Sequence, residues 1–108
     1  MSNELTRLMR VLEAVRQHDM HISVAQLQIL IYVGEHPDCT IMEAAEAVNL
    51  PTSTASRHIA ELGRGISRNS PGLELIESSE NPDNRRERLV QLTRKGGMLL
   101  NTITQLLK

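Results

Sequence analysis

Residues 40–62 read TIMEAAEAVNLPTSTASRHIAEL, and this stretch decides the fold. Thr40 and Glu43 form a capping-box pattern, in which the hydroxyl accepts a hydrogen bond from the amide three residues on and the carboxylate accepts one from the cap amide. The pattern predicts a helix that begins after Thr40 and ends where Asn49-Leu50-Pro51 interrupts the apolar period. A second short helix is predicted over residues 52–62, after a tight turn.

The second helix has two chemically different faces. The helical period places Ala55, Ile59 and Leu62 on one side, as an inward face. The other side is short-chained, hydroxylated and basic, so that a backbone can approach it, hydroxyls can bind phosphates, and arginine can bind guanine through two bonds. This arrangement is typical of the second helix of a helix-turn-helix. The alternative is an ordinary helical hairpin with a solvated outer face.

The residues predicted to contact DNA on this helix follow from its outward face. Ser53, Ser56 and Arg57 are expected to face the major groove, with Thr52 and Thr54 nearest the DNA backbone.

Length and composition predict one domain over residues 1–108 with an aliphatic core. The chain has one Tyr, no Phe and no Trp, and 40% of its residues are hydrophobic. No apolar run has membrane-spanning length, and the first residues lack the apolar region of a signal peptide. The single cysteine, Cys39, offers no disulfide framework. We therefore expect a cytoplasmic protein without a membrane partner.

Charge is divided unevenly along the chain. The formal net charge is −1, which by itself argues against a nucleic-acid partner. Residues 1–50 carry three basic and seven acidic side chains, whereas residues 51–108 carry nine basic and six acidic ones. The half that holds the predicted DNA-contacting helix is therefore the positive half, and the local patch matters more than the total.

A hairpin is predicted over residues 73–92, after a polar connector over 63–72. Two β-like runs, 73–78 and 88–92, flank a segment rich in turn formers. Arginines at or near the tip of such a projection can enter a minor groove or bind flanking phosphates. The alternative is a solvated charge cluster, because acidic residues alternate with the arginines. The predicted DNA-contacting residues of the hairpin are Asn84, Arg85, Arg86 and Arg88.

Helices at both ends carry broad apolar stripes. We expect these dimerisation helices over residues 1–20 and 94–108, because large uncovered stripes mark an interface. The alternative is that the two stripes of one chain cover each other and leave a monomer. The predicted interface residues are Leu5, Leu8, Met9, Leu12 and Val15 in the first helix and Leu99, Ile103, Leu106 and Leu107 in the last.

Three sequence pieces, taken in order, resemble the MarR-type winged-helix regulators. They are ISVAQLQIL at 22–30, LPTSTASR at 50–57, and NPDNRR at 81–86 followed by LVQLTRKG at 89–96. The likeness spans about residues 5–100. It implies a mainly α fold with a small β-hairpin, that is, a winged helix-turn-helix flanked by dimerisation helices. The chain departs from the family pattern at Asn84, where an Asp is usual, in its longer 63–72 connector, and in its single C-terminal helix.

The resemblance implies a homodimeric, sequence-specific regulator of transcription that binds a palindromic operator in duplex DNA and represses by occlusion. Two alternatives stay open: an accessory or replication factor for plasmid or phage DNA, and a protein-interaction module that no longer binds DNA. We expect no enzyme activity, metal or cofactor, because no nucleophile–base pair, phosphate loop or ligand cluster is present. His18 and His21 are expected to be solvated, and Cys39 to be a small buried side chain. A small-molecule effector is compatible with the family but not indicated by the residues.

Overall fold

The computed structural model describes residues 3–108 and contains five helices and five strands. The first two residues of the predicted 1–20 helix lie outside this range. The helices are α1 (Asn3–His18), α2 (Val24–Glu35), α3 (Ile41–Ala47), α4 (Thr52–Leu62) and α5 (Arg94–Leu107). The strands are β1 (Cys39–Thr40), β2 (Gly65–Ser67), β3 (Ser70–Pro71), β4 (Ile76–Asn81) and β5 (Asn84–Leu92).

Side-chain caps fix where α2, α3 and α5 begin, and the cap at Thr40 is the one predicted above. Both the Ser23–Gln26 and the Thr40–Glu43 capping boxes form, with both hydrogen bonds of each box present. Thr93 caps α5 by accepting a hydrogen bond from the amide of Gly96. These bonds satisfy backbone amides that have no partner within their own helix. The helix boundaries therefore follow from residues that are visible in the sequence.

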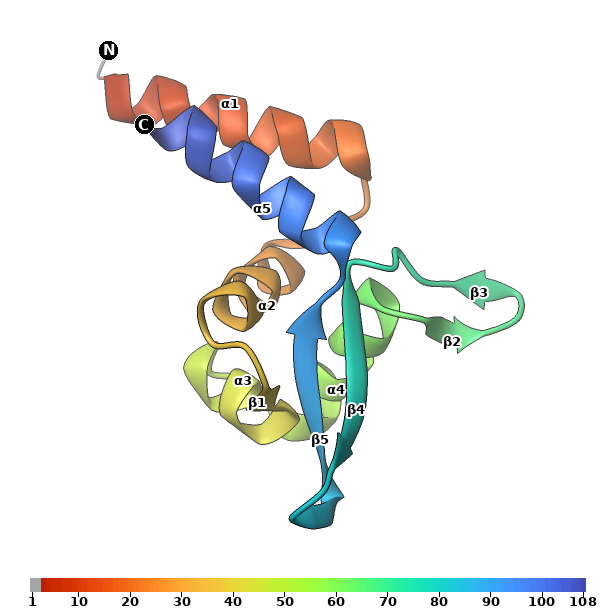
Figure 1. Ribbon diagram of the computed structural model, residues 1–108. Helices are drawn as coiled ribbons and strands as arrows, with labels where there is room; N and C mark the ends of the chain where they lie inside the picture. Colours follow the sequence, from red (N-terminus) through yellow and green to blue (C-terminus); the bar gives the residue numbers. More distant parts are fainter. Residues whose placement is uncertain (1–2) are drawn as a thin grey trace.

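The middle of the molecule is a helix-turn-helix packed on a small antiparallel sheet (Figure 1). The sheet has the strand order β1-β5-β4, with α2, α3 and α4 gathered around it. Asn49 takes a left-handed φ of 58° between α3 and α4, a conformation that Asn adopts more readily than most residues. The fully buried core is aliphatic, as expected, and its largest members are Ile29, Leu30, Leu62, Leu75, Val33 and Val90.

The terminal helices α1 and α5 lie side by side and project from this body (Figure 1). Val11 and Val15 of α1 are buried together with Leu99 and Ile103 of α5 in the same core cluster. No helix among residues 3–108 is long and apolar enough to cross a membrane.

The hairpin begins at Ile76 rather than at residue 73, but its strands pair further toward the turn than the sequence predicts. The strands pair from Ile76↔Leu92 to Asn81↔Asn84, so that the turn is reduced to Pro82-Asp83. The turn-forming residues before and after it are part of the ladder, and Glu80 lies opposite Arg88 in it. Opposite charges across a ladder favour pairing, which local turn propensity does not take into account.

The 63–72 connector is also more ordered than the sequence suggests. It forms a two-stranded ribbon, β2–β3, which projects from the end of α4 (Figure 1). The amide of Gly72 bonds to the carbonyl of Arg64, and the amide of Glu74 to the carbonyl of Gly63. Gly65 has a φ of +103°, and a Cβ added to Gly72 would meet the Gly63 carbonyl. The glycines therefore allow the chain to return to its starting point.

Candidate nucleic-acid interface

The second helix of the motif, α4, presents the two faces that its sequence predicts. Ala55, Ile59 and Leu62 are buried in the core. Ser53, Ser56 and Arg57 are exposed on the other side, as is Thr52, whereas Thr54 is half-buried. No side chain caps the helix at Pro51. Its first turn therefore offers backbone amides and hydroxyls to a phosphate.

Arg57 has no side-chain hydrogen bond or ion pair with any residue in 3–108. It stands at the edge of a cleft of about 290 Å³ between α4, the β2–β3 ribbon and the segment that joins α1 to α2. The guanidinium is therefore free to bind a base edge or a phosphate.

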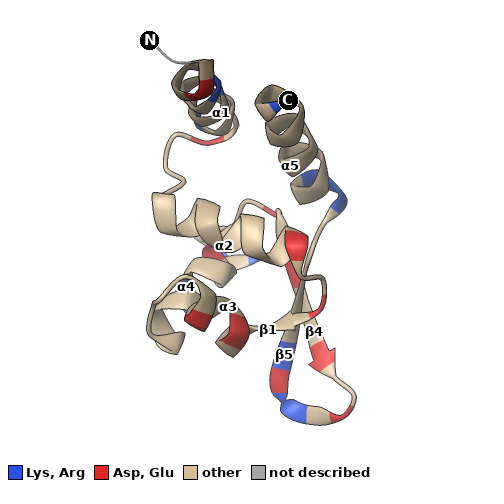
Figure 2. Cartoon of the chain, turned by 90° about the vertical axis from the view of Figure 1, so that its left-hand side faces the viewer, with Lys and Arg blue, Asp and Glu red and all other residues tan. Residues whose placement is uncertain are grey.

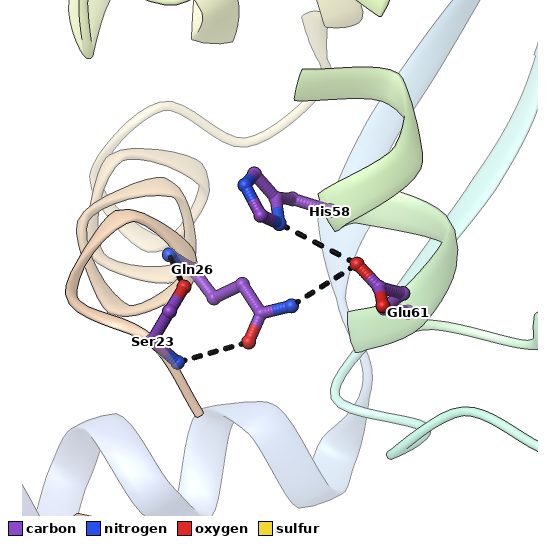
Figure 3. Close-up of polar contacts among 4 residues, drawn as sticks. All are labelled: Ser23, Gln26, His58 and Glu61. Carbon is purple, nitrogen blue, oxygen red and sulfur yellow. Dashed lines mark hydrogen bonds and ion pairs between the residues drawn. The ribbon is translucent and has the colours of Figure 1, made fainter. Parts of the chain in front are cut away.

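A polar contact that sequence reasoning missed ties α4 to α2. Gln26 accepts a hydrogen bond from the amide of Ser23 as part of its capping box, while its Nε2 donates to Oε1 of Glu61 at 3.3 Å (Figure 3). His58 Nδ1 lies 3.5 Å from the same Glu61 oxygen but is not aligned for a hydrogen bond. Gln26 is buried, whereas the Glu61 side chain is 39% exposed, so the contact is partly buried. It is expected to fix the rotation of α4 about its own axis.

The wing places Arg85 and Arg86 at its tip, beside the Pro82-Asp83 turn (Figure 2). Neither arginine side chain has a partner among the described residues. Asn84 Oδ1 accepts a hydrogen bond from the backbone amide of Arg86, and Asn84 Nδ2 donates to Glu87 Oε1. Asn84 thus organises the backbone at the tip without holding an arginine side chain, which leaves both guanidiniums exposed.

Arg88 lies differently from the two tip arginines. Its Nη2 donates to the carbonyl and to the hydroxyl of Ser78, both at 3.1 Å, across the hairpin. The structure therefore does not bring it together with Arg85 and Arg86 as one free cluster. The Arg88 side chain therefore links β5 to β4, although it is exposed to solvent.

The surface available for a partner subunit is narrower than the sequence predicts. Val15, Leu99 and Ile103 are buried within the chain, at 5%, 8% and 5% exposure, because α1 and α5 cover each other. These three residues contribute to the chain's own core, and a further contact of theirs with a partner subunit stays a prediction. Leu106 is half-buried. The other predicted residues are exposed by about half or more: Leu5, Leu8, Met9, Leu12 and Leu107.

The remaining candidate side chains form no site of their own. Cys39 is buried next to the Thr40 cap, and burial, aided by the Glu43 carboxylate, raises the pKa of its thiol. A raised pKa keeps the thiol protonated and weakly nucleophilic. Within residues 3–108 no group of three or more His, Cys, Asp or Glu side chains is placed to hold a metal ion.

Comparison with known proteins agrees with the resemblance. Residues 18–64 match the MarR family profile, and this segment contains α2, α3 and α4. No curated protein matches the sequence.

Many solved structures share the fold. A Staphylococcus aureus MepR–DNA complex has a TM-score of 0.74 at 23% identity and covers 87% of this chain and 69% of its own. The Mycobacterium tuberculosis RV1404 protein has a TM-score of 0.77 at 23% identity, covering 94% and 64%. Streptococcus pneumoniae FabT in complex with DNA has a TM-score of 0.71 at 20% identity, covering 94% and 69%.

The chain is shorter than these proteins. It spans 58% of the length of another of them, the MarR family regulator SP03579. The likeness nevertheless extends over the helix-turn-helix, the wing and both terminal helices. The chain therefore has the MarR-type winged-helix fold and carries the MarR family's sequence pattern over residues 18–64.

Proposed function

We propose that this protein is a sequence-specific, double-stranded DNA-binding regulator of transcription that acts as a homodimer and represses by occluding a promoter. The observation that carries the proposal is the outer face of α4. That face buries nothing within the chain and presents Ser53, Ser56 and an unpaired Arg57. A second helix with exposed hydroxyls and a free arginine is suited to the major groove.

The wing supports the same function through a second contact. Arg85 and Arg86 are exposed at the end of a projecting hairpin, where they can bind a minor groove or its flanking phosphates. Two of the solved structures with this fold contain DNA, the MepR and FabT complexes.

A homodimer is proposed because one α4 contacts too few bases for useful specificity. Leu8, Met9 and Leu12 form an exposed apolar stripe on α1, and Leu107 of α5, which packs beside α1, is also exposed. Burying a Leu side chain is worth about 1.5–3 kcal/mol, so pairing these stripes between two copies is favourable. The operator is then expected to be palindromic, with half-sites about one DNA turn apart.

The proposal is tested by mobility shifts on mixed-sequence DNA at several salt concentrations, followed by selection from a random pool. We expect affinity to fall steeply with salt and the selected DNA to converge on a palindrome. Absence of salt-dependent binding would instead make the chain a protein-interaction module. Selected DNA without two-fold symmetry would contradict the homodimeric arrangement alone.

A further inference from the structure

A cleft of about 600 Å³ lies at the base of the wing, at the opposite end of the hairpin from its Pro82-Asp83 turn. It opens between the end of α4, strands β4 and β5, and the first turn of α5. We call it the basal cleft. The charged side chains that line it are Arg64, Arg88, Arg94 and Lys95, together with Glu74 and Glu77.

Three of the four cations in the basal cleft have no partner. Arg64, Arg94 and Lys95 make no side-chain hydrogen bond or ion pair with residues 3–108, and all three are exposed. The fourth, Arg88, is held in place by Ser78. The two carboxylates do not neutralise the cluster, so the lining carries an excess of two positive charges.

The position of two of these cations is unfavourable on its own. Arg94 and Lys95 are the first residues of α5, and the first turn of that helix contains no acidic side chain. The positive end of a helix dipole favours anions and repels cations. Glu74 and Glu77 line the same cleft but form no ion pair with Arg94 or Lys95, so a bound anion would relieve this repulsion more directly.

We propose that the basal cleft binds a small, phosphate-bearing anion. Guanidinium groups bind phosphate oxygens through paired, charge-assisted hydrogen bonds, and the lysine adds a point charge. The negative charge of such a ligand complements the excess of positive charge in the lining. The cleft has no aromatic lining residue, so a planar aromatic ligand would find nothing to stack on.

A small ligand fits this position better than duplex DNA does. Strand β5 runs from Asn84 at the wing tip, past Arg88 in the lining of the cleft, to Leu92, two residues before Arg94. At about 3.3 Å per residue this distance is roughly 26 Å. A duplex held by the wing tip and by the N-terminal half of α4 would therefore lie away from Arg94 and Lys95.

The binding test uses the full-length, ¹⁵N-labelled protein titrated with pyrophosphate at constant ionic strength. We expect saturable shifts of the amide signals of Gly63, Arg64 and residues 93–96. The double substitution R94Q/K95Q should weaken binding at least tenfold. Its matched control, R10Q/R16Q, removes two exposed arginines from α1 and should bind pyrophosphate as the wild type does.

Thermal unfolding gives a second readout that also reports folding of the variants. Pyrophosphate should raise the Tm of the wild type and of the control, because a ligand that binds the native state stabilises it. Without ligand, R94Q/K95Q should have a Tm equal to or above that of the wild type. Its Tm should respond less to pyrophosphate.

Equal affinity of R94Q/K95Q and wild type, or shifts confined to Arg85 and Arg86, would overturn the proposal. Shifts of residues 93–96 on addition of DNA, with none on addition of pyrophosphate, would also overturn it and assign the cleft to DNA. The titration with pyrophosphate contains no DNA. Its failure would therefore leave the proposed regulatory function standing.

Discussion

Gln26 of α2 and Glu61 of α4 are 35 residues apart in sequence and are joined by a hydrogen bond of 3.3 Å from Nε2 to Oε1. The same Gln26 side chain accepts a hydrogen bond from the Ser23 amide. One buried side chain thus caps one helix and holds the helix proposed to contact DNA. Replacing it therefore affects both stability and the placement of α4.

Gln26→Ala should lower the free energy of unfolding by about 1–3 kcal/mol, because it leaves a cap amide and a partly buried carboxylate without their partner. Urea unfolding with an unchanged m value would measure this loss. Gln28→Ala, at an exposed position of the same helix, should change stability by less than about 0.5 kcal/mol. If both variants are as stable as the wild type, the hydrogen bonds of Gln26 contribute nothing to the free energy of unfolding.

Arg57→Ala should weaken binding to the selected operator by about 1–3 kcal/mol and relax the preference at one base position. The reason is that Arg57 is exposed and unpaired on the outer face of α4. Affinity for a panel of operator variants measures both effects. Arg10→Ala, on the exposed side of α1, is the charge-matched control. If Arg57→Ala binds every sequence as tightly as the wild type does, the residue is not in the interface.

Replacing Arg85 and Arg86 together with Ala should make the plot of log affinity against log salt shallower by about one to two units, because two phosphate contacts are lost. Arg88→Ala should leave this slope nearly unchanged and instead weaken the hairpin, since Arg88 bonds to Ser78. Equal slopes for the double variant and the wild type would mean that the wing tip does not reach the phosphates.

Leu12→Asp should give a folded monomer that has lost specific DNA binding, because Leu12 is 47% exposed on the proposed partner surface. Sedimentation equilibrium measures the mass against the 12.1 kDa chain. Ile103→Asp is expected to unfold the chain instead, since Ile103 is buried against α1 and an unpaired charge there is costly. A wild-type mass near 12.1 kDa at micromolar concentration would exclude the dimer.

Stability should depend on pH through the Thr40–Glu43 capping box. Hydrogen bonds from the Thr40 backbone and side chain hold the pKa of Glu43 below its ordinary value of 4.5. The stabilisation is therefore complete above pH 4.5 and is lost as the pH falls through the depressed pKa. Glu43→Gln keeps a hydrogen-bond acceptor but does not titrate. The difference in free energy of unfolding between this variant and the wild type should therefore change below pH 4.5. Parallel unfolding profiles from pH 3 to 6 would contradict this.

The sequence predicts the parts of this molecule that depend on neighbouring residues. The Thr40–Glu43 capping box, the two faces of α4 and the Asn49 turn involve residues close together along the chain. The resemblance carried by three short sequence pieces predicts a MarR-type winged helix. The comparison with solved structures confirms this fold. The assignment of the DNA-contacting residues stays a prediction. The structure adds which of their side chains are exposed.

The parts that the sequence does not predict depend on contacts between distant segments. Nothing near Gln26 indicates that Glu61 will accept its hydrogen bond. The burial of Ile103 could not be separated from a partner surface, because an apolar stripe looks the same whether its own chain or another covers it. The sequence predicts strands that stop short of the turn, because residues 79–87 are rich in turn formers, whereas cross-strand pairing carries the ladder on to Asn81 and Asn84.

The β2–β3 ribbon begins and ends at the same place. Leu73 and Leu75 bond back to the carbonyls of Glu61 and Leu62, so the chain rejoins the core at the end of α4. Residues 64–72 thus form a loop whose two ends lie close together. Each doubling of the length of such a loop costs only about 0.6 kcal/mol. Insertions or a fluorescent label at the exposed residues 67–69 of this segment should be accommodated without a change in the angle between α4 and the wing. The ribbon is therefore where this fold can gain or lose residues between related proteins.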